Sequence, residues 1–209
     1  MSETLIANNC IGGSILHDLG LRFNTPTINL QILPAEYPKF CKNLRHYMET
    51  ELVEYKEISD KHKYELINMF GHVPKGEFPY GLCDNIIICF QHYPTFKDAK
   101  DAWDRRKARI NYNHIGFIFY LAWDFDQKRA LEFADLGLKH STIFTERFDI
   151  GITHFRVDPP EGTHFLDIAP NGKKYYEQEF NPISYIETIR RDCSLMLTGK
   201  PAGLSDNPE

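Results

Sequence analysis

The 209-residue sequence lacks several features that would assign it directly to a class of protein. Its five cysteines include no C-x-x-C pair, which argues against a disulfide framework and against a structural zinc site. Lysine and arginine number 24 against 29 aspartates and glutamates, and a net charge of −5 argues against a nucleic-acid-binding protein. No apolar run approaches the ~18 residues of a membrane span, and the first residues do not resemble a signal peptide. We therefore expect a cytoplasmic protein.

Aromatic residues, by contrast, are abundant, with 15 phenylalanines and 11 tyrosines available for a sizeable core. Apolar segments typical of strands alternate with amphipathic segments typical of helices. This alternation predicts an α/β fold, a mainly parallel sheet flanked by helices, with extra antiparallel strands toward the C-terminus. Strands are expected at 3–8, 27–33, 85–93, 115–123 and 141–147, and helices at 14–19, 34–48, from 95, and at 124–137.

The texture of the sequence changes after residue 147. Short β-like segments are separated there by the turns Pro159–Pro160 and Asn171–Gly172, and Asn181 is placed to cap a final helix. We expect residues 1–147 to form an α/β core domain and residues 148–209 to form a β-hairpin and helix extension packed on it.

Cys10 lies in the segment LIANNCIGGSILHDLGL, at a turn between an expected strand and a short helix. A thiol pKa of about 8.5 falls at a helix N-terminus, so Cys10 is a candidate nucleophile. The N–H groups of Gly12, Gly13 and Ser14 could form an oxyanion hole. His92 is the candidate base, because its strand is expected to be buried on both faces like a parallel strand and to end at the ligand-binding edge of the sheet. The alternative is that Cys10 is a small buried residue, because free cysteine is among the most buried residue types.

Two further motifs could bind anions. Gly12 and Gly13 at a helix start could cradle a phosphate, although the segment is not G-x-G-x-x-G and a simple tight turn is the alternative. Arg106 lies near the apolar stripe of its helix, so it either pairs with a carboxylate such as Asp84 or points into a ligand site. Arg105 shares a charged face with Arg109, which a solvated surface would also explain.

The sequence Asp124-Phe125-Asp126 follows an expected strand directly. Two aspartates at this spacing can hold a divalent metal against a nucleotide-sugar diphosphate, whereas the alternative is that one of them caps the next helix. The histidines lack metal-ligand spacing, so we expect no permanent metal. Together with Asn8 and Asn9, Asp124 is expected at the sheet edge where open α/β folds bind ligands.

Three segments carry a family resemblance: NNCIGG, FPYGLCDNIIICFQHY (78–93) and AWDRRKARIN (102–111). Over residues 4 to 147 they resemble a domain-of-unknown-function family, number 1919, of bacterial proteins labelled exopolysaccharide or capsule biosynthesis. The NNC turn is also similar to the GNC turn of a capsule acetyltransferase family, in which cysteine and histidine handle an acyl group. Ile11 and Gly12 stand where that family has its glycine–glutamine feature.

The resemblance implies surface-polysaccharide assembly as the context, and the residues suggest three activities. The first is a transferase in which Cys10 attacks an acyl donor and His92 takes its proton. The second is a metal-dependent glycosyl or phosphosugar transferase, and the third is a non-catalytic sugar-phosphate-binding module. The substrate would be a small molecule or saccharide, with an acyl-CoA or a nucleotide sugar as donor. The substrate-binding residues would be Asn8, Asn9, Gly12, Gly13, Arg105, Arg106 and Asp124.

Overall fold

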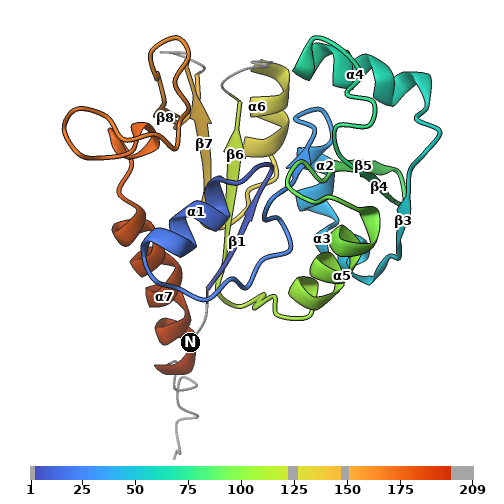
Figure 1. The fold of residues 1–209 in the computed structure, drawn as a ribbon. Coiled ribbons are helices and arrows are strands. Elements are labelled where there is room, and N and C mark those ends of the chain that lie inside the picture. Colours follow the sequence, from blue (N-terminus) through green and yellow to red (C-terminus); the bar gives the residue numbers. More distant parts are fainter. Residues whose placement is uncertain (1–2, 122–126, 147–150, 199–209) are drawn as a thin grey trace, which may run out of the picture.

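The computed structural model describes residues 3–121, 127–146 and 151–198, and these residues build two four-stranded sheets (Figure 1). The first sheet is parallel, with the strand order β1-β6-β7-β8, and the second is antiparallel, with the order β2-β5-β4-β3. The parallel strands are β1 (Thr4–Ala7), β6 (Ile115–Tyr120), β7 (Ser141–Thr145) and β8 (Phe155–Arg156). The antiparallel strands are β2 (Gln31–Ile32), β3 (Leu52–Glu54), β4 (Tyr80–Cys83) and β5 (Ile86–Cys89).

The α/β class predicted from the sequence is confirmed, but the antiparallel strands lie in the first half of the chain, between Gln31 and Cys89. Near the C-terminus, β8 pairs in parallel with β7. Residues 175–177 form a 3-10 helix where a strand was expected, and the pairing of 163–174 is reduced to a single bridge between Ile168 and Lys174. The described helices are α1 (Ile11–Asp18), α2 (Tyr37–Lys42), α3 (Leu44–Glu49), α4 (Asp60–Phe70), α5 (Phe96–Lys107), α6 (Gln127–Ala134) and α7 (Pro182–Thr198).

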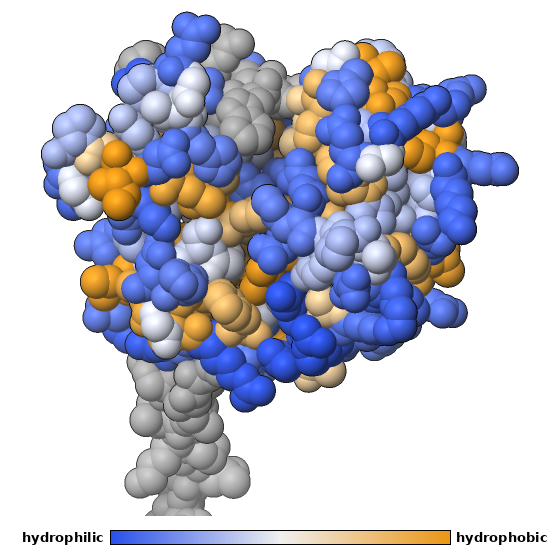
Figure 2. Space-filling view, viewed as in Figure 1, coloured by the Kyte–Doolittle hydropathy of each residue, from blue (hydrophilic) through white to orange (hydrophobic). Residues whose placement is uncertain are grey.

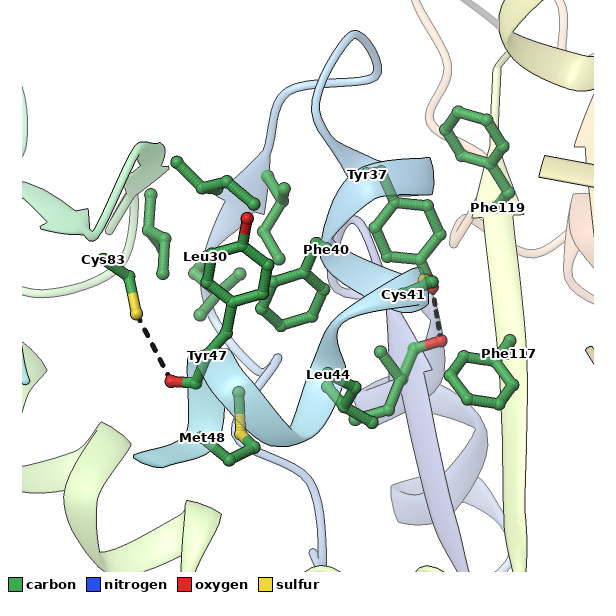
Figure 3. Close-up of a cluster of buried hydrophobic side chains, with 14 of the residues drawn as sticks. Leu30, Tyr37, Phe40, Cys41, Leu44, Tyr47, Met48, Cys83, Phe117 and Phe119 are labelled. Atoms are coloured by element: carbon green, nitrogen blue, oxygen red, sulfur yellow. Dashed lines mark hydrogen bonds between the residues drawn. The ribbon is translucent and has the colours of Figure 1, made fainter. Parts of the chain in front are cut away.

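Helices cover both faces of the parallel sheet. Successive side chains of a strand point to opposite faces, and in these strands the side chains on both faces are apolar. Leu5, Ile118 and Phe144 face the layer that contains α1 and α7. Ile6 and Phe119 face the opposite layer, which contains α2, α3, α5 and α6. In that layer the α2–α3 aromatic and aliphatic side chains pack directly against Phe117 and Phe119 of β6 (Figure 3). Each fully buried side chain of this size contributes about 1.5–3 kcal/mol to folding.

Several helix boundaries follow from local sequence signals. The predicted start of α5 is confirmed, because the Thr95 hydroxyl accepts a hydrogen bond from the Asp98 N–H at 3.1 Å. Ser59 caps α4 in the same way, and Gly71 ends it with φ +77°, a conformation that glycine adopts without strain. The single helix expected at 34–48 is two short helices, which meet at the non-helical Asn43.

The strand β5 departs most from the prediction. It pairs in antiparallel fashion with β4 through a tight turn at Asp84–Asn85, where Asp84 has φ +54°. The expectation that this strand ends at the ligand-binding edge of the parallel sheet is therefore wrong. None of the helices in the described residues is both long and apolar enough to cross a membrane.

Candidate active site at the carboxyl edge of the parallel sheet

The four parallel strands end at one edge of their sheet, which is the upper edge in Figure 1. Ala7 pairs with Ile118, Tyr120 pairs with Phe144, and Thr145 pairs with Arg156. Residues that follow these strands are therefore brought together although they are far apart in the sequence. Open parallel sheets bind their ligands at this carboxyl edge.

Asn8 and Asn9 follow β1 at this edge, as the sequence predicts, and both side chains hold the backbone. The Asn8 amide donates to the Tyr120 carbonyl at 3.0 Å and accepts from the Tyr120 N–H at 2.8 Å. Asn8 is 1% exposed. Because its side chain bonds both the carbonyl and the N–H of Tyr120, it extends the β1–β6 pairing beyond the last residue of β1. The side-chain Oδ1 of Asn9 accepts from the Ile11 N–H at 3.0 Å, at the first residue of α1. The two asparagines shape the edge of the sheet.

Cys10 occupies the N-cap position of α1 and is partly exposed. Burial raises the pKa of its thiol, against the lowering effect of the backbone N–H groups of Asn29 and Leu30, which contact the sulfur. The sulfur lines a pocket of about 250 Å³ whose other walls include His17 and Lys174. Asn29 has φ +60°, and with this backbone conformation the N–H groups of two successive residues reach the sulfur.

The two glycines of α1 bring the helix close to its neighbours. A Cβ at Gly12 would lie 3.2 Å from the Cβ of Ala7, and a Cβ at Gly13 would lie 3.1 Å from Cγ1 of Ile28. Both glycines are buried. Their packing is sufficient reason for glycine at these positions, so a phosphate cradle is not needed to explain them.

The arginines expected to bind a ligand have other surroundings. Arg106 donates through one nitrogen to the Tyr93 hydroxyl at 2.5 Å and to the Ile28 carbonyl at 3.3 Å. The suggested partner Asp84 lies instead beside His46, at 3.1 Å. Arg106 thus fixes the segment whose next two residues contact the sulfur of Cys10. Arg105 is exposed on α5, and Asp124 lies outside the described residues.

His92 follows β5 and is exposed. Its charge influences His164, so the two histidines are close, whereas the described residues that line the Cys10 pocket do not include His92. The structure therefore brings His92 close to His164, which is not among the site residues predicted from the sequence.

A cluster of titratable groups lies where β6, β7 and β8 end. Burial and then the charge of Asp158 raise the pKa of Glu146, which directly follows β7. Burial and the charge of His92 lower the pKa of His164, although Asp167 opposes the shift. Burial and then the charge of Glu146 raise the pKa of Tyr120. Several groups with shifted pKa values at a ligand-binding edge are typical of catalytic sites.

Aromatic contacts and backbone hydrogen bonds fix the geometry of this cluster. The ring of Phe165 lies 4.4 Å from the Tyr120 ring and 4.0 Å from the His164 ring, measured between centroids. The Leu166 N–H donates to Nδ1 of His164 at 3.3 Å, which places the proton of the neutral ring on Nε2. The carboxylate of Asp167 accepts from the backbone N–H of His164 at 2.7 Å. We name Tyr120, Glu146, Asp158 and His164 the edge cluster.

The sequence carries one signal for this cluster, a repeated tripeptide. Thr-His-Phe occurs twice within a few residues, at 153–155 and 163–165, and an aspartate follows each copy at 158 and 167. In the described part of the chain, no group of three histidine, cysteine, aspartate or glutamate side chains is placed to hold a metal ion.

Comparison with known proteins gives a family. The family model "Domain of unknown function (DUF1919)" matches residues 2–157, which include β1, β6, β7 and β8. An uncharacterized protein of Haemophilus influenzae (strain ATCC 51907 / DSM 11121 / KW20 / Rd) is 29% identical over 184 residues, covering 84% of this chain and 80% of that protein. The matched region contains Tyr120 and Glu146, whereas His164 lies just beyond it. The chain belongs to the DUF1919 family.

Proposed function

We propose that this protein is a transferase of bacterial surface-polysaccharide assembly that uses the edge cluster for general acid–base chemistry. The observation that carries the proposal is that Glu146 and His164 both adjoin Tyr120 at the carboxyl edge, Glu146 through its charge and His164 through the Phe165 ring, with pKa values shifted upward at Glu146 and downward at His164. The shifts bring the two pKa values closer together. They thereby raise the fraction of molecules in which His164 is neutral while Glu146 is still protonated.

The reaction supported by these groups is transfer of a glycosyl, phosphosugar or acyl group from a donor to a saccharide hydroxyl. Neutral His164 takes the proton of the attacking hydroxyl on Nδ1, its unprotonated nitrogen, which gives up the 3.3 Å bond from the Leu166 N–H as the hydroxyl oxygen forms the new bond to the transferred group. The bond to the leaving group breaks, and protonated Glu146 gives its proton to the leaving atom. Protons and electron pairs balance, and the Phe165 ring offers an apolar wall beside both Tyr120 and His164.

The test is a donor screen with variants. Purified protein is incubated with UDP-glucose, UDP-N-acetylglucosamine or acetyl-CoA and a mixture of mono- and disaccharide acceptors, and products are identified by mass spectrometry. We expect His164→Gln and Glu146→Gln each to lower kcat by about 10²–10⁴-fold. Glu161→Gln changes an exposed carboxylate in the same segment and should leave kcat unchanged. Equal rates for all three variants would refute the edge cluster as the catalytic site.

Acyl transfer through Cys10 is a second candidate, favoured by the sulfur's position on two backbone N–H groups at a pocket. The thiolate would attack the thioester carbonyl of an acyl donor, and free CoA would leave. Incubation with acetyl-CoA followed by mass spectrometry should then give a protein acetylated on Cys10, and Cys10→Ser should abolish it. Acetylation confined to lysines would exclude this candidate.

The remaining two interpretations are separated by the same assay. The metal-dependent version relies on Asp124 and Asp126, which lie outside the described residues, and it requires product formation that stops on addition of a chelator. The non-catalytic version requires saccharide binding without any product. Turnover that persists in the chelator supports the acid–base proposal over both.

A further inference from the structure

A second groove lies away from the edge cluster, between the loop that joins β3 to α4 and the loop that joins α4 to β4. Its volume is about 700 Å³, within the range of about 300–1,000 Å³ typical of small-molecule sites. Its lining includes the aromatic residues Tyr55, Phe78 and Tyr80 and three lysines. We call it the aromatic groove. The elements around it lie on the opposite side of the molecule from β8 (Figure 1).

The aromatic side chains of the groove are fixed before any ligand binds. The Phe78 and Tyr80 rings are 5.1 Å apart between centroids, and the Tyr80 hydroxyl donates to the Pro74 carbonyl at 2.7 Å. The Tyr55 hydroxyl accepts from the Ser59 N–H at 2.9 Å and lies 3.0 Å from Nδ1 of His62. Because the Tyr55 hydroxyl already has protein partners and Tyr80 is buried, at 7% exposure, a ligand would meet the half-buried rings of Tyr55 and Phe78. Flat rings such as nucleobases stack on the faces of such rings.

The three lysines come from three separate parts of the chain: Lys56 before α4, Lys63 on α4 and Lys75 after it. Lys56 lies 3.0 Å from Glu54, and Lys63 lies 2.8 Å from Asp60. Both pairs are exposed, and such pairs contribute little to stability, so a ligand anion can replace the carboxylates. Apolar and hydrophilic side chains accordingly lie side by side over α4 and the neighbouring strands (Figure 2).

We propose that the aromatic groove binds a nucleoside diphosphate, with the base stacked on the aromatic side chains and the two phosphates held by the lysine ammonium groups. Glu54 and Glu57 also line the groove, so three lysines leave one positive charge in excess before the ligand arrives. Ammonium groups on flexible stems can gather around several phosphate oxygens. A ligand with both a flat ring and adjacent phosphates fits the two chemical halves of the groove. The proposal does not depend on the edge cluster or on catalysis.

The test uses UDP as the probe, with uridine and pyrophosphate as its two separated halves. Binding is measured by calorimetry, and the site is located by the NMR shifts of the Ile58 and Val73 methyl groups, which line the groove. We expect UDP to bind at least about tenfold more tightly than either half, because stacking and phosphate contacts then act together. Lys75→Glu should lower UDP affinity by about tenfold or more, whereas Lys75→Arg should retain it.

Two further variants make the test specific. Phe78→Leu keeps an apolar side chain but removes the flat ring, so it should weaken UDP and leave pyrophosphate unchanged. Lys42→Glu makes the same charge change on α2 at an exposed position that does not line the groove, and it should alter nothing. Absence of UDP binding, shifts confined to other methyl groups, or equal affinity in Lys75→Glu would overturn the proposal. Binding of a glucuronate-containing oligosaccharide in place of UDP would overturn it as well.

Discussion

Two glutamates of this molecule, Glu36 and Glu146, have surroundings in which the charges are arranged differently. Glu36, on the segment before α2, is 4% exposed and accepts hydrogen bonds from His62 at 2.9 Å and from the Ile87 N–H at 2.9 Å. Burial alone would raise the pKa of Glu36, but His62, the Ile87 N–H and Lys61 together lower it. The carboxylate is therefore kept ionised by donors on α4 and β5.

Glu146 has the opposite surroundings. Burial and the charge of Asp158 both raise its pKa, whereas burial and the charge of His92 lower the pKa of His164 at the same edge of the sheet. Glu36 is paired with groups of opposite charge and connects its own segment to α4 and β5. Glu146, in contrast, lies near Asp158, a group of like charge. Buried titratable groups alone therefore do not identify an active site. Titratable groups whose surroundings disfavour their usual charge state are a better indication of an active site.

The largest effect that tests this comparison is expected at Glu36. Glu36→Gln removes the charge and turns an amide NH₂ toward the donors of Ile87 and His62, so we expect a loss of about 3 kcal/mol in the free energy of unfolding. Urea unfolding measures it. Glu77→Gln is the matched control, because Glu77 forms a pair with His72 at 2.8 Å that is more than half exposed. It should cost less than about 1 kcal/mol. Equal losses would mean that Glu36 is not specially stabilised.

Glu36, His62 and the Tyr55 hydroxyl form a hydrogen-bonded network. Tyr55→Phe tests the Tyr55 end of this network, and its effect should be smaller. The variant leaves the Ser59 N–H and Nδ1 of His62 without the hydroxyl, and we expect a loss of about 1 kcal/mol. Tyr64→Phe on α4 is the control, since Tyr64 is 65% exposed. If Tyr55→Phe were neutral, the network would end at His62.

The elements predicted well are those set by local signals. Thr95 with Asp98 identifies the start of α5, and the Asn8-Asn9 turn is correctly placed after β1. The strand β5 was assigned to the wrong sheet because its run of isoleucines is buried like a parallel strand. The Asp84–Asn85 turn before it is the signal of a hairpin, and a residue with φ +54° there reverses the chain.

The edge cluster could not be assembled from the sequence for a physical reason. Glu146 becomes distinctive only through burial and through Asp158, and that proximity depends on the two-residue pairing of β7 with β8. His164 lies in a segment with little regular structure, where residue periodicity carries no information. The repeated Thr-His-Phe tripeptide was the available signal, and it marks the residues without saying which of them meet.

Glu146→Gln gives the third test and should act in the direction opposite to Glu36→Gln. Replacing a carboxylate that burial and Asp158 disfavour by a neutral amide should not destabilise the protein, and we expect a gain of up to about 1 kcal/mol. The measurement is the same urea unfolding at neutral pH. A loss comparable with that of Glu36→Gln would show that Glu146 is a structural carboxylate, and the comparison would then fail.

The pH dependence of these two variants is the subtlest test, because it follows the sign of each shift. The pKa of Glu36 in the folded state lies below its ordinary value of 4.5, so its contribution is present above pH 4.5 and lost as pH falls through the lowered value. The pKa of Glu146 lies above 4.5, so its protonated form contributes stability below pH 4.5 that is lost as pH rises through the raised value. Measured from about pH 3 to about pH 8, the Tm deficit of Glu36→Gln should therefore grow with pH, and so should the Tm gain of Glu146→Gln. A gain at Glu146→Gln that is largest in acid would mean that its carboxylate, like that of Glu36, is stabilised by the fold, and it could not then supply a proton near neutral pH.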